Sequence, residues 1–184
     1  MADVVESTEI PGVWLIRLEV HSDERGRFLE TYRSSWLPFA APMVQANRSD
    51  SAAKVLRGLH YHRRQLDYWV VASGRALVAL VDVRPVASEA ADRAPVETHE
   101  LAADDWVVIP AGVAHGFLAL EALELLYLVT NEFDGSDELG FAWDDPAVGV
   151  PWPVIDATPD GRPILSDRDR SNPSLAELVA SLRD

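Results

Sequence analysis

The sequence predicts a mainly β protein built as a small barrel or sandwich. Short stretches rich in β-branched and aromatic residues follow one another closely, separated by turn signals that contain proline and glycine. His60 and His62 alternate within one such stretch, so their side chains point to the same face of a strand. A third histidine, His115, comes much later, after another such turn. The pattern indicates a barrel with chemically active groups in its interior.

Each expected element follows from local composition. A polar turn at residues 23–27 separates the first two strands, and a short helix is expected at residues 34–39. The polar segment 84–95, which contains two prolines, is interpreted as a surface loop. The strand candidates cover residues 13–20, 28–32, 54–62, 68–72, 75–84, 106–109, 115–120 and 123–130.

A helix is expected at the end of the chain. Asn172-Pro173 suits a cap followed by a first helical turn, and the helix would run to about Arg183. Ser174 with Glu177 offers a capping box in an alternative register.

Bulk composition limits the classes of function. A chain of 184 residues suits one compact domain, so we expect residues 1–184 to form a single unit. The absence of cysteine excludes disulfides and thiolate metal ligands. The net charge of −14 argues against nucleic acid or an acidic membrane as a partner. Without a long apolar run or a signal-peptide pattern, we expect a cytoplasmic protein.

Motifs spread over nearly the whole chain form an ordered set: Asp23-Glu24-Arg25-Gly26-x-Phe28-x-Glu30, Val44-Gln45-x-Asn47-x-Ser49, Val55-Leu56-Arg57-Gly58-Leu59-His60-Tyr61, Val81-Asp82-Val83-Arg84, Ile109-Pro110-x-Gly112-x-Ala114-His115-Gly116-Phe117, Leu126-Tyr127, Trp143-x-Asp145-Pro146 and Leu165-Ser166-x-x-Asp169. Together they resemble the dTDP-4-dehydrorhamnose 3,5-epimerase family. The resemblance implies a cupin-type jelly-roll barrel with short flanking helices, usually a homodimer. It also implies a nucleotide-sugar substrate, a dTDP-4-keto-6-deoxyhexose, epimerised at carbon-3, carbon-5 or both without metal or other cofactor.

The implied chemistry explains which catalytic residues are needed. Removing a hydrogen beside a ketone leaves an enolate, so epimerisation needs a base, an opposite-face proton donor and a group that stabilises the oxyanion. By resemblance His60 is the base, and Asp169 is the carboxylate that raises its basicity. Tyr127 matches the proton donor, and Arg57 matches the residue that stabilises the oxyanion.

The resemblance also implies a set of substrate-binding side chains, part of which acts across the dimer interface. Without the resemblance, one substrate-binding and two catalytic candidates have simpler interpretations. Arg25 would form a salt bridge within a turn, Tyr127 would be a core residue, and Asp169 would lie in a solvated charged run. The implied substrate-binding residues are Arg25, Phe28, Glu30, Gln45, Asn47, Arg57 and His115.

Two positions depart from the family pattern. Asp67 stands where family members usually carry a lysine that helps hold the enolate oxygen, and His62 stands where glutamine is common. A carboxylate beside an enolate destabilises it unless the acid is protonated or paired. Both departures favour a first-row divalent transition metal, bound as in other cupins by His60, His62, Asp67 and His115.

Three functions therefore stay open from the sequence. The favoured function is the metal-free epimerase, and the first alternative is a metal-dependent cupin enzyme. The second alternative is a relative that binds a sugar nucleotide without turning it over.

Overall fold

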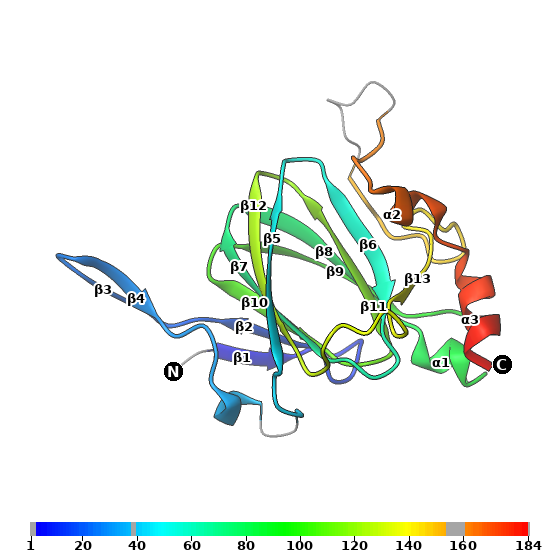
Figure 1. Cartoon of the computed structure of the whole chain (residues 1–184), viewed down its shortest axis with the longest axis horizontal. Coiled ribbons are helices and arrows are strands. Elements are labelled where there is room, and N and C mark those ends of the chain that lie inside the picture. The colour runs from blue at the N-terminus through cyan, green and yellow to red at the C-terminus, as the bar shows by residue number, and fades with distance from the viewer. Residues whose placement is uncertain (1–2, 38–39, 154–160, 184) are drawn as a thin grey trace.

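Two antiparallel sheets face each other and enclose a barrel, which confirms the mainly β jelly-roll prediction (Figure 1). The computed structural model describes residues 3–37, 40–153 and 161–183. In spatial order the first sheet contains β1 (Asp3–Glu6), β2 (Trp14–Arg17), β10 (Asp105–Ile109), β7 (Asp67–Ser73), β12 (Leu123–Val129) and β5 (Gln45–Ser51). The second contains β13 (Leu139–Gly140), β6 (Leu56–Tyr61), β11 (Val113–Ala119), β8 (Arg75–Asp82) and β9 (Val96–Ala102).

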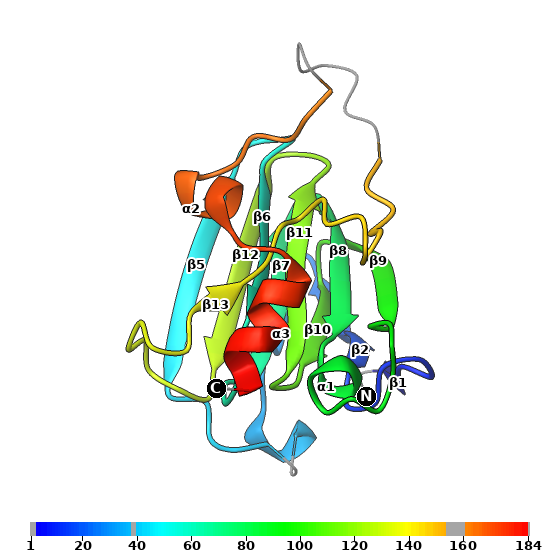
Figure 2. The same cartoon turned by 90° about the vertical axis from the view of Figure 1, so that its right-hand side faces the viewer.

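Apolar side chains pack in three layers. Between the sheets, Trp69, Phe117 and their neighbours fill one end of the barrel. The outer face of the second sheet is covered by α3 (Leu175–Arg183), which Figure 2 shows lying across it. The outer face of the first sheet packs around the buried Trp106, which stacks on Trp36. The layer between the sheets borders a cavity, because Trp69 and Phe117 belong to this layer and also line that cavity.

The C-terminal helix follows its sequence signals. The Ser174 and Glu177 backbone and side chains bond reciprocally, so the capping box forms and α3 begins at Leu175. Leu178 and Val179 are buried against the second sheet, as expected for positions that share one helix face. Among the described residues, no helix combines the length and apolar character that a membrane crossing requires.

Two predicted elements were wrong in detail. The strand expected at residues 13–20 is divided, because the chain leaves the first sheet after Arg17. It then forms the hairpin of β3 (Val20–Asp23) and β4 (Gly26–Leu29), whose strands pair with each other. The segment expected to be only loop at residues 84–95 begins with α1 (Arg84–Ala87), whose proline occupies the first helical turn.

Other differences arise from weak sequence signals. The sequence did not predict β1, β5, β9 or β13; in β5 the inward-facing positions are polar, so the alternation carries no hydrophobic signal. The short helix expected at residues 34–39 is the 3₁₀ turn η1 (Ser34–Trp36), and residues 38–39 lie outside the described ranges.

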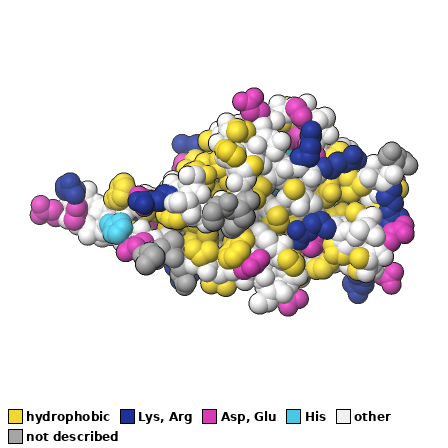
Figure 3. Space-filling model, turned by 90° about the horizontal axis from the view of Figure 1, so that it is seen from below, with side chains coloured by type: hydrophobic (Ala, Val, Ile, Leu, Met, Phe, Trp, Pro, Cys, Tyr) yellow, Lys and Arg dark blue, Asp and Glu magenta, His cyan; other side chains and the backbone are white. Residues whose placement is uncertain are grey.

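The β3–β4 hairpin projects away from the barrel (Figure 1). Seen from below, it stands clear of the body, with acidic and basic side chains at its tip (Figure 3). Phe28 on this hairpin is 64% exposed. The hairpin therefore presents a large apolar side chain away from its own barrel.

Candidate active site

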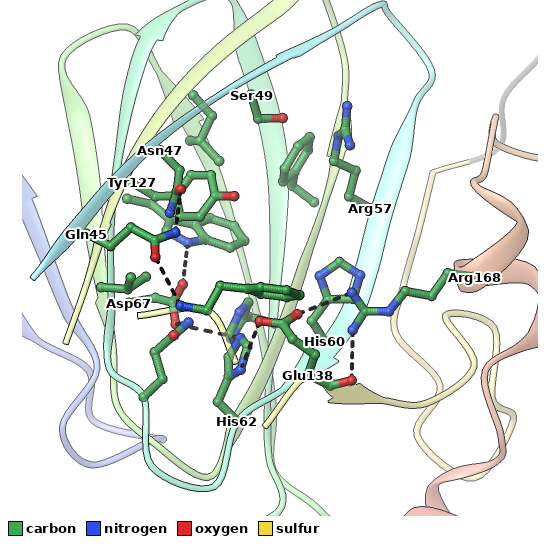
Figure 4. A pocket seen from close by; sticks show the side chains of 17 residues that line it. Gln45, Asn47, Ser49, Arg57, His60, His62, Asp67, Tyr127, Glu138 and Arg168 are labelled. Atoms are coloured by element: carbon green, nitrogen blue, oxygen red, sulfur yellow. Dashed lines mark hydrogen bonds and ion pairs between the residues drawn. The ribbon is translucent and has the colours of Figure 1, made fainter. Parts of the chain in front are cut away.

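A cavity of about 320 Å³ opens between the two sheets. Its volume falls at the lower end of the range of small-molecule sites. Polar and aromatic side chains from both sheets converge on it (Figure 4). The lining residues are Gln45, Asn47, Ser49, Arg57, His60, His62, Gln65, Asp67, Trp69, His115, Phe117, Leu125, Tyr127, Val129, Phe133, Glu138 and Arg168.

His60 and Asp169 form a hydrogen-bonded pair at the cavity wall. His60 Nε2 lies 2.7 Å from Asp169 Oδ1, which leaves Nδ1 as the other ring nitrogen. The carboxylate is 4% exposed and accepts a second hydrogen bond from Ser166 Oγ at 2.8 Å. Burial raises the pKa of Asp169, but the hydrogen bond and charge of His60, with help from Ser166, hold it below its ordinary value. Asp169 is therefore an anion fixed behind the imidazole.

Local structure fixes both partners of this pair. Ser166 is the N-cap of α2 (Asp167–Ser171), and its hydroxyl accepts the backbone N–H of Asp169 at 3.1 Å. On the other side, β6 approaches β11 closely at two glycines. A Cβ on Gly58 would lie 2.6 Å from the Gly116 Cα, and Gly58 has a φ of 124°. Side chains at these two positions would force β6 and β11 apart next to His60.

Tyr127 lies on the opposite side of the cavity. It belongs to β12 in the first sheet, whereas His60 belongs to β6 in the second, so the two side chains enter from facing sheets (Figure 4). Burial raises the pKa of Tyr127, and the negative charges of Asp67 and Glu138 raise it further. The phenol therefore keeps its proton at neutral pH and can donate it.

Three further predicted residues, Gln45, Asn47 and Arg57, line the same cavity. Gln45 Nε2 donates to Asn47 Oδ1 at 2.8 Å, which orients both amides on β5. Arg57 Nε donates to Ser51 Oγ at 3.1 Å, and a terminal nitrogen donates to the Asp50 carbonyl at 3.3 Å. These bonds tie the guanidinium of β6 to the neighbouring β5.

The residues expected on the early substrate segment lie elsewhere. Arg25 and Phe28 belong to the projecting hairpin, and Glu30 directly follows it. Arg25 pairs with Asp23, and Glu30 pairs with Arg33. Within one chain none of the three predicted residues lines the cavity.

Part of the predicted metal set is brought together. Ligand atoms of His62, Asp67 and His115 lie within 4.8 Å of one another, and all three side chains are buried. His60 does not belong to this cluster, and its Nε2 is instead hydrogen-bonded to Asp169. The four-residue ligand set is therefore reduced to two histidines and one carboxylate.

Two charged cavity residues were missed from the sequence. Arg168 bonds Glu138 at 3.2 Å beside His60, and both side chains line the cavity (Figure 4). Arg168 lies in a charged run that was interpreted as a solvated loop, and Glu138 follows a Gly-Ser-Asp turn. Neither carried a local signal, because their pairing joins segments 30 residues apart.

The fold and the cavity define a cupin-type jelly-roll barrel whose interior holds a histidine–aspartate pair facing a tyrosine. Comparison with known proteins narrows this class. The family model described as dTDP-4-dehydrorhamnose 3,5-epimerase matches residues 7–177. The chain therefore belongs to the dTDP-4-dehydrorhamnose 3,5-epimerase family.

Similar proteins cover almost the full chain. The dTDP-4-dehydrorhamnose 3,5-epimerase of Pseudomonas aeruginosa is 36% identical over 179 residues, which are 91% of this chain and 93% of that protein. The structure of a dTDP-6-deoxy-D-glucose-3,5-epimerase from Legionella pneumophila, in complex with dTDP-4-keto-L-rhamnose, aligns with a TM-score of 0.85 and 27% identity, covering 99% and 97%. ChmJ, a 3'-monoepimerase from Streptomyces bikiniensis in complex with dTDP-quinovose, aligns with a TM-score of 0.80 and 29% identity, covering 97% and 99%.

Proposed function

We propose that this protein epimerises a dTDP-4-keto-6-deoxyhexose at carbon-3, carbon-5 or both, through an enolate. The observation that carries the proposal is the 2.7 Å contact of His60 with Asp169 at a cavity wall, across from Tyr127. Inversion at a carbon beside a ketone needs a base on one face of the sugar and an acid on the other. Family membership supports a nucleotide sugar as the substrate.

The proposed reaction consists of two proton transfers, one to His60 and one from Tyr127. His60 Nδ1 takes the hydrogen beside the ketone, and the electron pair of the C–H bond moves to the carbonyl oxygen. Asp169 stabilises the imidazolium that results, because a buried carboxylate faces its Nε2–H. Tyr127 then gives its proton to the carbon from the opposite face, and the enolate returns to a ketone. Solvent restores the proton of Tyr127 and removes the one on His60.

Substrate binding is assigned to the cavity rim and to the hairpin. Gln45 and Asn47 hold the sugar, since amide groups match hydroxyl oxygens, and the guanidinium of Arg57 stabilises the negative charge that develops on the enolate oxygen. We place Arg25, Phe28 and Glu30 of one chain at the cavity of a second chain in a homodimer. The outward projection of the hairpin and the 64% exposure of Phe28 support this arrangement.

The cellular setting completes the proposal. We expect each chain to act as one domain, in the cytoplasm, with neither nucleic acid nor a membrane as a partner. The net charge of −14 supports the absence of a polyanionic partner. The proton transfers use protein side chains and need no organic cofactor.

The function is tested by incubation with dTDP-4-keto-6-deoxyglucose in deuterated water. We expect deuterium to replace hydrogen at carbon-3, carbon-5 or both, followed by inverted stereochemistry in the NMR spectrum. Substrate that binds but keeps both hydrogens would instead support the sugar-nucleotide-binding relative without turnover.

A further inference from the structure

His62, Asp67 and His115 gather at the deep side of the cavity, apart from the His60–Asp169 pair. His62 directly follows β6, Asp67 begins β7 and His115 lies on β11, so segments of both sheets contribute. The residues are 5%, 2% and 3% exposed, respectively. Two imidazoles and one carboxylate form a donor set that first-row divalent metals prefer.

The backbone orients both imidazoles for coordination. His62 Nδ1 lies 2.7 Å from the Asp137 carbonyl, and His115 Nδ1 lies 3.1 Å from the Val113 carbonyl. Each Nδ1 must donate its hydrogen to an oxygen, which leaves the Nε2 lone pair free. Histidines that bind metals commonly make this outer hydrogen bond.

Asp67 is a buried carboxylate that lacks a strong cationic partner. Its oxygens accept hydrogen bonds from Gln65 Nε2 at 3.1 Å and Trp69 Nε1 at 3.3 Å. Among the described residues, the basic group that the structure places within ion-pair distance is His62 alone. A buried carboxylate is costly unless it is paired or coordinates a metal.

The nearby arginines do not supply the missing charge. Arg63 donates to the Ser181 carbonyl, and Arg64 pairs with Asp134 at the surface. Both side chains therefore point away from Asp67.

The spacing fits an ion better than a direct hydrogen bond. His62 Nε2 and Asp67 Oδ2 are 3.9 Å apart, which is beyond hydrogen-bonding distance. An ion that lies about 2.0 to 2.2 Å from each ligand separates two ligand atoms by roughly 3 to 4 Å. The ligand atoms of all three residues lie within 4.8 Å of one another, so shifts of about 1 Å would bring them to that range.

We propose that His62, Asp67 and His115 bind one divalent first-row transition metal ion whose open positions face the cavity. The catalytic role of this ion rests on the proposed function: a divalent cation would add to the positive charge of Arg57 at the enolate oxygen and offset the negative charge of Asp67 beside it. When bound, the ion would neutralise Asp67 and supply a Lewis acid for the ketone oxygen, while His60 and Tyr127 move the protons. The metal ion would keep its oxidation state throughout, because enolisation transfers protons only.

Metal binding is tested on chelator-treated full-length protein by titration with Co²⁺, followed by visible absorption, and with Zn²⁺, followed by calorimetry. We expect one ion per chain. Affinity should fall by more than about 100-fold in Asp67→Asn and His62→Gln, since loss of a direct ligand exceeds the cost of an outer-shell change. The matched control is His99→Gln, which removes a histidine that lies 3.0 Å from Glu97 outside the cavity.

The outcomes separate the site from its role. Failure to bind Co²⁺ or Zn²⁺, or equal affinity in all variants, would overturn the metal site. Deuterium exchange into the substrate should be slow in stripped protein and restored by Zn²⁺; an equal rate in both forms would overturn the Lewis-acid role and leave the epimerase intact. Absence of exchange in both forms would refute the proposed function, and the titration alone would then decide the metal site.

Discussion

Replacing Asp169 by asparagine removes the charge behind His60 while keeping the side chain's shape. In the wild type the carboxylate lies 2.7 Å from His60 Nε2 and is 4% exposed. When His60 takes a proton from the sugar, the new imidazolium gains a charge-assisted hydrogen bond to this carboxylate. An amide at the same place offers only a neutral partner. We therefore expect Asp169→Asn to slow proton abstraction more than it weakens binding.

The size of the effect follows from that one contact. A hydrogen bond between charged groups contributes about 1.5 to 3 kcal/mol. Since about 1.36 kcal/mol corresponds to a tenfold change in rate, the loss of this contact lowers kcat roughly 10- to 150-fold. An asparagine that fixed the wrong imidazole tautomer would lower kcat further.

The assay is steady-state epimerisation of dTDP-4-keto-6-deoxyglucose at neutral pH, with kcat and KM measured separately. Asp167→Asn is the matched control, because Asp167 lies on the same helix with a fully exposed side chain paired only to Arg170 at 3.3 Å. We expect the control to keep wild-type kcat. Equal kcat values for Asp169→Asn and Asp167→Asn would refute the role assigned to the pair.

Three further predictions concern stability, charge and assembly. Because the folded pKa of Asp169 is lowered, its ionised form stabilises the fold above about pH 4. The advantage of wild type over Asp169→Asn in urea unfolding should therefore be present at neutral pH and disappear as pH falls through the lowered pKa. Asp67→Asn should lower the pKa of Tyr127 in metal-free protein, because a negative charge that raises this pKa is removed. A pH titration of phenolate absorbance, with Tyr127→Phe as the reference, measures the pKa, and an unchanged pKa would contradict the prediction. Arg25→Ala should raise KM and leave kcat nearly unchanged if the hairpin serves a second copy; an unchanged KM would contradict this placement of Arg25.

The strands with apolar alternation could be predicted from the sequence, whereas β5 could not. Its inward positions, such as Gln45 and Asn47, are polar because they line a cavity instead of a core. The strand predicted at residues 13–20 is divided because the β3–β4 hairpin leaves the sheet, and this depends on tertiary structure. Local propensity carries no information about either feature.

The site was predictable where neighbours in sequence are neighbours in space. The alternation of His60 and His62 placed both on one face, and both line the cavity. The partner of His60, Asp169, lies 109 positions away in a charged run, so only the family resemblance indicated it. That same contact removes His60 from the metal cluster, a consequence that spacing along the chain could not show.

The most direct test of the central claim compares hydrogen exchange in two variants. His60→Asn removes the proposed base, and Tyr127→Phe removes the proposed proton donor on the facing sheet. We predict that His60→Asn abolishes deuterium entry into dTDP-4-keto-6-deoxyglucose, while Tyr127→Phe still exchanges the substrate hydrogen but forms epimer roughly 100- to 10,000-fold more slowly. Wild-type exchange in His60→Asn would contradict the assignment of His60 as the base.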